Sequence, residues 1–153
     1  MTQLADAPDG LATDELQLAT FYVGDMLLGL NIDRVQEINR RLDVTVVPHA
    51  PDCVRGVINL RGEVVTVVDL KAVLGLGRSA ATRESRNLIV SHNDELVGFW
   101  VDRIADILTV TSEAIDPTPP NVDTADTRHF QGVYALEEDI VIVLNVDTVL
   151  EMA

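Results

Sequence analysis

The hydrophobic positions of the chain fall into short runs separated by turns, which is typical of β-structure. The clearest runs are Val54–Leu60 and Glu63–Val68, joined by a tight turn at Arg61-Gly62, where glycine allows the positive φ of a hairpin. Residues Val64–Val68 are apolar on both faces, so this strand is expected inside a small barrel or sandwich. Asp69 then caps a predicted short helix, Leu70–Leu74.

The same pattern recurs later in the chain, which indicates an internal duplication. An offset of 76 relates the central hairpin to a second one, and an offset of 69 relates the preceding segments. The matches at 76 include Gly56/Gly132, Val65/Val141, Val67/Val143 and Asp69/Asn145; those at 69 include Leu27/Leu96, Gly29/Gly98, Asp33/Asp102, Arg34/Arg103 and Ile38/Ile107. The sequence therefore predicts two similar β subdomains, about 16–75 and 87–150, joined by a polar linker, 76–86.

Most of the remaining elements are also expected to be strands. The predicted strands are Leu16–Val23, Met26–Asn31, Asp43–Val47, Asn87–His92, Glu95–Val101, Ile107–Thr111, Phe130–Leu136 and Asp139–Asn145. Short helices are predicted at Asp33–Asn39, where Val35 and Ile38 share one face, and at Val146–Met152. Residues 1–15 are expected to be a flexible tail, and Thr111–His129 the longest exposed loop. The fold class is mainly β, with twin barrels in a single domain.

Composition narrows the class of partner. The chain has 153 residues, is 47% hydrophobic and carries a formal net charge of −14, which argues against nucleic acid and anionic membranes. No apolar run is long enough to span a membrane, and the N-terminus lacks a signal peptide, so we expect a cytoplasmic location. The single lysine among ten arginines and the many aspartates suit either a salt-rich cytosol or a GC-rich genome.

Candidate chemistry is sparse. The three histidines lie in separate turns without metal-ligand spacing, so no metal site and no cofactor are predicted. Cys53 has no partner for a disulfide and is interpreted as a packing residue. The duplication could bring Asp33 and Asp102 together as a catalytic dyad. The arginine that follows each aspartate would keep both carboxylates ionised, so we interpret them as helix or turn caps and predict no enzyme.

Two charged residues stand out against apolar surroundings. Glu37 and Arg61 are either a solvated pair at the rim of the fold or a charge pair that orders a binding groove, and the residues alone leave both interpretations open. Twin barrels without a catalytic constellation are typical of binding modules, and the groove between them suits a partner helix.

Several motifs resemble the CheW family of chemotaxis coupling proteins. They are Phe21-Tyr-Val-Gly24, Val35-Gln-Glu-Ile38, Val54-Arg-Gly-Val-Ile-Asn-Leu-Arg-Gly62, Val67-Val-Asp-Leu70 and Val101-Asp102. The resemblance runs in order from about Leu16 to Val149, and the length leaves no room for an additional kinase or receiver domain.

The resemblance implies two five-stranded SH3-like barrels around a shared core. It also implies a non-catalytic adaptor that joins the cytoplasmic tips of chemoreceptors to the regulatory domain of the histidine kinase CheA, at membrane-associated arrays. Carried over by position, the receptor-facing groove would comprise Val35, Glu37, Ile38, Gly56 and Arg61, with Ile104 and Ile107 from the second unit. Kinase-contacting residues cannot be assigned in this way.

Two other functions stay open at this point. The chain could serve the same adaptor role in an array that controls pili or gliding rather than chemotaxis. A twin barrel could also bind a small molecule, which a ligand-induced rise in melting temperature would reveal.

Overall fold

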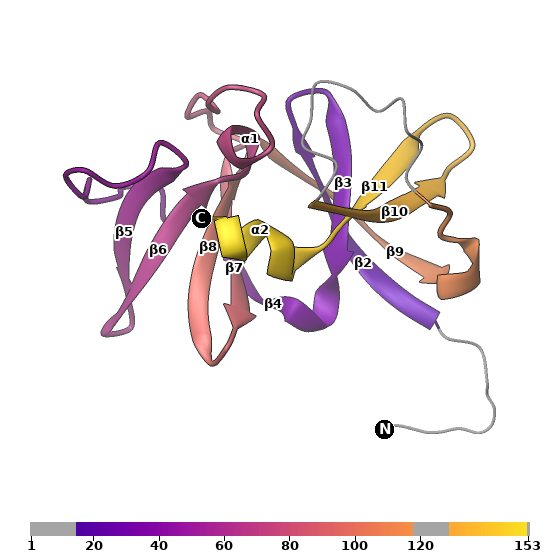
Figure 1. Cartoon of the computed structure of the whole chain (residues 1–153), viewed down its shortest axis with the longest axis horizontal. Helices are drawn as coiled ribbons and strands as arrows, with labels where there is room; N and C mark the ends of the chain where they lie inside the picture. Colours follow the sequence, from indigo (N-terminus) through magenta and orange to yellow (C-terminus); the bar gives the residue numbers. More distant parts are fainter. Residues whose placement is uncertain (1–14, 118–128, 153) are drawn as a thin grey trace.

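Strands dominate the computed structural model, which describes residues 15–117 and 129–152. They form two five-stranded sheets that lie side by side (Figure 1). We call the first the central sheet, because residues 35–101 form it without interruption. We call the second the terminal sheet, because both ends of the chain contribute to it. The predicted mainly β fold is confirmed.

The central sheet has the order β4-β7-β8-β6-β5. Its strands are β4 (Val35–Asn39), β5 (Val54–Leu60), β6 (Glu63–Asp69), β7 (Arg86–His92) and β8 (Glu95–Val101). The hairpins β5–β6 and β7–β8 are antiparallel, and β6 pairs with β8 in parallel. Strand β4 is an edge, paired only with β7 among the described strands.

The terminal sheet repeats this arrangement with the order β9-β2-β3-β11-β10. Its strands are β2 (Glu15–Val23), β3 (Met26–Asn31), β9 (Arg103–Thr111), β10 (Phe130–Ala135) and β11 (Ile140–Leu144). Here β3 and β11 form the parallel pair, and β9 is the edge strand next to β2.

The matched strand orders support the duplication but correct its domain boundaries. Segment 16–75 gives its first hairpin to the terminal sheet and its last three strands to the central sheet, and segment 87–150 does the reverse. The expectation that each sequence repeat folds as its own subdomain is therefore wrong. In each sheet, the first hairpin of one repeat pairs with the last hairpin of the other repeat. The sequence offset alone does not predict this exchange.

One further bridge extends each sheet towards closure. Thr45, which follows β4, pairs with Val57 of β5, and Asp116, which follows β9, pairs with Val133 of β10. The chain after each edge strand thus reaches the strand at the opposite edge of the same sheet. A sheet that closes on itself leaves fewer unpaired backbone groups, as in a small barrel.

Hydrophobic residues form three cores. The largest takes residues from both sheets and both α-helices, α1 (Leu70–Val73) and α2 (Val146–Met152), and includes Phe21, Leu28, Val68, Phe99 and Val149. Each sheet has a smaller core of its own, to which Val65 and Val67 contribute in the central sheet and Val141 and Val143 in the terminal sheet. All four valines are at most 3% exposed, as predicted.

Local predictions succeeded at the central hairpin. Arg61 and Gly62 both have positive φ, 53° and 86°, and the side chain of Asn59 accepts a hydrogen bond from the Gly62 amide at 2.8 Å. Asp69 caps α1 by accepting from the amides of Lys71 and Ala72. In contrast to Val65 and Val67, Val64 is 72% exposed, so β6 is not buried on both faces.

The predicted helix Asp33–Asn39 is wrong. A 3₁₀ turn, Ile32–Arg34, is capped by Asn31 rather than Asp33, and the strand β4 follows it. Residues Asp43–Val47 form the Thr45 bridge but no strand. The predicted loop Thr111–His129 starts with the end of β9 and the turn Ser112–Ala114, and its central part, 118–128, lies outside the described residues, as do 1–14.

Candidate partner-binding surface

The two edge strands β4 and β9 carry most of the predicted groove residues. An offset of 69 relates Val35 to Ile104 and Ile38 to Ile107, so the four residues are two equivalent pairs. Val35 and Ile104 are partly buried against the shared core. Ile38 and Ile107 are 43% and 57% exposed, respectively. Each edge therefore has one apolar side chain that supports the core and one that faces solvent.

Each edge strand contains a register shift. Val35 pairs with Val90, but Glu37 pairs with Ile89, so Gln36 is an extra residue on β4. In the terminal sheet, β9 has a register shift in the equivalent place, between the Phe21–Ile104 and Ala19–Ile107 pairs. Such bulges twist an edge and re-aim its side chains. Both edge strands thus carry the same irregularity at equivalent positions.

Glu37 and Arg61 form an ion pair between β4 and the β5–β6 turn. Nη2 of Arg61 donates to Oε1 of Glu37, and Nδ2 of Asn39 donates to Oε2 of Glu37 at 2.9 Å. The hydrogen bond from Asn39, together with the Arg61 guanidinium, lowers the pKa of Glu37 below its usual value. The carboxylate is thus ionised at neutral pH. Arg61 is 70% exposed, which leaves most of its donors accessible to a partner.

Gly56 has a different place from the other six residues. It is buried, with φ of 147°, and a Cβ there would lie 2.4 Å from the carbonyl oxygen of Thr45. The Thr45–Val57 bridge requires this close approach. Gly132 has the same role beside Asp116, whose carbonyl oxygen would lie 2.6 Å from a Cβ. Gly56 therefore shapes the sheet beneath the surface and offers no side chain to a partner.

The structure unites only part of the predicted site. Glu37 and Arg61 are in contact, and Ile38 lies next to Glu37 on β4, while Ile104 and Ile107 lie on the other sheet. Four hollows on the described surface are lined by other residues. Each edge presents one exposed isoleucine, Ile38 or Ile107, so a groove between the two edges remains a prediction.

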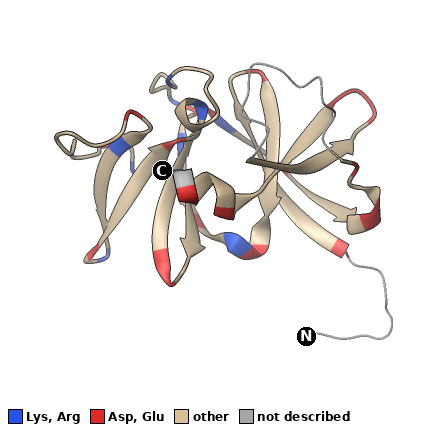
Figure 2. Cartoon of the chain, viewed as in Figure 1, with Lys and Arg blue, Asp and Glu red and all other residues tan. Residues whose placement is uncertain are grey.

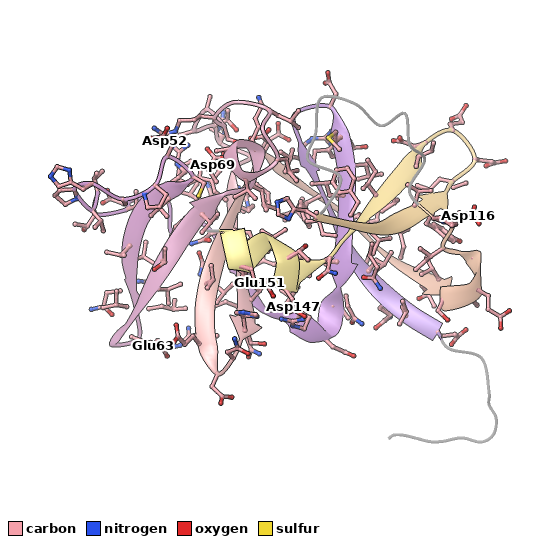
Figure 3. The ribbon with its side chains drawn as sticks, viewed as in Figure 1. Asp52, Glu63, Asp69, Asp116, Asp147 and Glu151 are labelled. Carbon is pink, nitrogen blue, oxygen red and sulfur yellow. The ribbon has the colours of Figure 1, made fainter. Side chains whose placement is uncertain are left out.

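A buried polar network at the other end of β6 was not predicted. Asp69 is fully buried, and its Oδ2 accepts from Nη1 of Arg55 at 2.9 Å and from the amide of Ser79 at 2.9 Å. The Arg55 guanidinium lies 3.6 Å from the ring centroid of Trp100, a cation–π contact. Glu63 and Asp69 mark the two ends of β6 in Figure 3. The one sequence signal is Arg55 itself, a charge set in an apolar strand.

A second polar cluster holds α2 against the central sheet. Asp147 on α2 accepts from Nη2 of Arg34 at 3.0 Å and lies 3.1 Å from Nδ1 of His92 (Figure 3). The hydrogen bond and charge of Arg34, with a smaller contribution from His92, lower the pKa of Asp147. The former dyad candidates have separate roles, since Asp102 accepts from the Gly24 amide at 2.7 Å and Asp33 lies in the 3₁₀ turn.

Other chemistry finds little support in the part of the chain that the structure describes. Over residues 15–117 and 129–152, no group of three or more His, Cys, Asp or Glu side chains is placed to hold a metal ion. Burial raises the pKa of the Cys53 thiol, which disfavours the nucleophilic thiolate. None of the described helices has the length and apolar character needed to cross a membrane.

Comparison with known proteins decides the family. The model of the CheW-like domain matches residues 17–153, which is nearly the whole chain. The chain belongs to the CheW family.

Relatives of similar length include chemotaxis proteins. The CheW chemotaxis protein of Rhizobium meliloti is 35% identical over 146 residues, which cover 95% of this chain and 94% of the relative. The CheW of Thermotoga maritima is 30% identical and covers 99% of this chain and 95% of its own. The crystal structure of the scaffolding protein TtCheW from Thermoanaerobacter tengcongensis matches with a TM-score of 0.80, at 28% identity, over 92% of this chain and 89% of that one. This CheW family member is accordingly a scaffold-type protein of chemotaxis.

Proposed function

We propose that this protein is a non-catalytic adaptor that joins the signalling tip of a chemoreceptor to the regulatory domain of the histidine kinase CheA. Two observations support the proposal at the level of the whole chain. The family match extends over residues 17–153, and the fold offers two equivalent edge strands, β4 and β9. An adaptor at receptor arrays would act in the cytoplasm.

The receptor surface would be built on β4 and extended by β9. The observation that carries this assignment is the ordered Glu37–Arg61 pair next to the exposed Ile38. A partner helix that presents an apolar stripe and a carboxylate would bury Ile38 and pair with the exposed side of Arg61. Val35, Ile104 and Ile107 would complete the apolar contact, and Gly56 would set the shape of the sheet.

The test is a three-component binding experiment with purified proteins. A soluble receptor-tip fragment is immobilised, and the kinase regulatory domain is added with and without this protein. The kinase domain should be retained only when this protein is present, because it supplies both contacts. The surface variant Ile38→Asp should abolish the bridge, while Ile140→Asp, at another exposed apolar position of 54% exposure, should preserve it. Retention of the kinase domain in the absence of this protein would contradict the proposal. So would an equal loss of retention with Ile38→Asp and Ile140→Asp.

A further inference from the structure

The positive charges of this acidic protein are concentrated in one region. Three hollows that share lining residues contain six of the 11 Lys and Arg residues of the chain. The first hollow lies between the end of β4 and the linker before β7, and it shares Arg40 with the second and Thr82 and Glu84 with the third. We name these six residues the basic band: Arg40, Arg41, Lys71, Arg83, Arg86 and Arg103.

The band has a surplus of positive charge in a chain of net charge −14. The three hollows include three acids, Asp43, Glu84 and Asp102, against the six cations. Elsewhere the surface is acidic, and Figure 2 shows Asp and Glu at several hairpin ends, among them the β10–β11 turn. The residues of the duplicated unit that correspond to Arg40, Arg86 and Lys71 are Thr109, Gln17 and Asp147. Arg103 has a basic counterpart in Arg34, but these three cations have none, so the band as a whole is not repeated in the duplicated unit.

The cations of the band are not used within the fold as ion-pair partners. The four ion pairs among the described residues are Arg34–Asp147, Arg55–Asp69, Arg61–Glu37 and His92–Asp147, and none of them includes a band residue. Instead, Arg41 and Arg86 donate to backbone carbonyls, and Arg103 stacks on Tyr22 at 4.0 Å. These contacts fix the side chains without an ion pair, although the charge of Arg41 also acts on Glu37.

The linker that carries Arg83 is held in place by buried groups. The amide of Ser79 donates to Asp69 and the carbonyl of Ser79 accepts from Arg55, at 2.9 Å and 2.8 Å. Further along, Oγ of the buried Ser85 accepts from the Thr82 amide at 2.9 Å, and Arg86 donates to the Arg83 carbonyl at 2.9 Å. A surface that is already ordered loses less entropy on binding.

We propose that the basic band docks a short acidic segment of a partner protein. Arginines outside ion pairs offer planar donor sets that match carboxylates. Long polyanions fit less well, because the charge of the remaining surface repels a nucleic acid or an anionic membrane that extends beyond the band. Single-stranded nucleic acid also requires exposed aromatic faces, and the one aromatic residue that lines these hollows, Tyr22, is covered by Arg103. The band begins where β4 ends, but it contains none of the residues proposed for the receptor surface.

The test uses the full chain and a fluorescein-labelled hexaglutamate peptide, with fluorescence anisotropy as the readout. In 0.1 M NaCl the Debye length is about 10 Å, so distant acids are screened while direct contacts persist. The peptide should bind, and 0.5 M NaCl should weaken binding at least about tenfold. Arg40→Glu and Arg83→Glu should each weaken it about fivefold, since each replaces an attraction by a repulsion.

The matched control is Arg78→Glu. Arg78 is exposed in the same linker as Arg83 and lines none of the three hollows, so this variant makes the same charge change outside the band. It should change the peptide affinity less than about twofold. An equal loss in Arg78→Glu and Arg83→Glu would reduce the effect to net charge and overturn the proposal. So would the absence of peptide binding, or tighter binding to hexathymidylate or phosphatidylserine vesicles.

Discussion

The central and terminal sheets have the same strand order, equivalent edge bulges and the same close approach at Gly56 and Gly132, yet their polar residues differ. The ion pair of Arg55 and Asp69 corresponds to Gln131 and Asn145, and the pair of Glu37 and Arg61 corresponds to Asp106 and Glu137. Apolar and glycine positions are therefore sufficient for the shared architecture. The charged pairs distinguish the central sheet as the more specialised of the two.

The largest effect should come from the buried Arg55–Asp69 pair of the central sheet. Asp69→Asn removes the negative charge that Arg55 and the Ser79 amide contact. Arg55, whose side chain is only 15% exposed, is then left without its counter-ion. We expect the free energy of unfolding to fall by about 3 kcal/mol, measured by urea denaturation. Asn145→Ala, at the equivalent position, removes one 3.3 Å hydrogen bond to Thr148 and should lower it by about 1 kcal/mol. Equal losses would remove the distinction between the sheets.

A double variant sharpens the same point. Arg55→Gln with Asp69→Asn gives the central sheet the two residues of the terminal sheet and leaves no unpaired charge. It should recover at least half of the stability that Asp69→Asn loses, because removing both partners of a buried pair costs less than removing one. If the double variant were as unstable as Asp69→Asn, Asp69 would act through the cap of α1 and the linker rather than through Arg55.

The apolar positions should respond alike in both sheets. Val67→Ala and Val143→Ala each remove two methyl groups from a side chain that is at most 3% exposed, in equivalent strands. We expect each to lower the free energy of unfolding by about 2 kcal/mol. The same loss is expected for Val65→Ala and Val141→Ala. Urea denaturation of the four variants measures this. A difference of more than about 1.5 kcal/mol within either matched pair would contradict the equivalence of the two sheets.

Sequence reasoning was most successful where neighbouring residues decide the structure. The turn at Arg61-Gly62 and the cap by Asp69 depend on backbone conformation and on amides two or three residues away. The burial of the four valines follows from the apolar run of β6 and from its repetition in the second half of the chain. Each of these features is encoded within a few residues, so it could be predicted before the partners in space were known.

The predictions from sequence failed where pairing between strands that are distant in the chain determines the structure. Val35 and Ile38 have a spacing that fits a helix, but pairing of β4 with β7, for example Ile38 with Leu88, makes them a strand with a bulge at Gln36. The exchange of hairpins between the repeats could not be predicted from the sequence offset either. An offset identifies equivalent residues, but it does not identify which strands lie next to each other in space. The Arg55–Asp69 pair joins two strands and was missed because Asp69 already had a local explanation as a cap.

The smallest effect concerns the ionisation of Glu37. Its pKa is lowered in the folded state, first by Asn39 and then by Arg61, so its contribution to stability is present above the unfolded pKa, near 4.5, and is lost as the pH falls through the folded pKa. Asn39→Ala and Arg61→Ala should each raise the midpoint of Glu37, because the first removes a hydrogen bond and the second removes a hydrogen bond and a positive charge, as carbon-detected NMR titration of the side-chain carboxyl would measure. An unchanged midpoint in either variant would exclude that residue as a cause of the lowered pKa.

The most direct test of the proposed receptor surface compares three properties of Arg61→Ala. We expect its affinity for a receptor-tip fragment to fall about tenfold or more by calorimetry, because a central arginine contact with a partner carboxylate is lost. Its melting temperature should change little, since Arg61 is 70% exposed on a turn, and its affinity for the kinase regulatory domain should be preserved. Arg61→Lys should restore little, as a point charge cannot reproduce the planar contact, and Glu137→Ala should have no effect. Unchanged receptor affinity in Arg61→Ala would contradict the assignment of the β4 edge as the receptor surface.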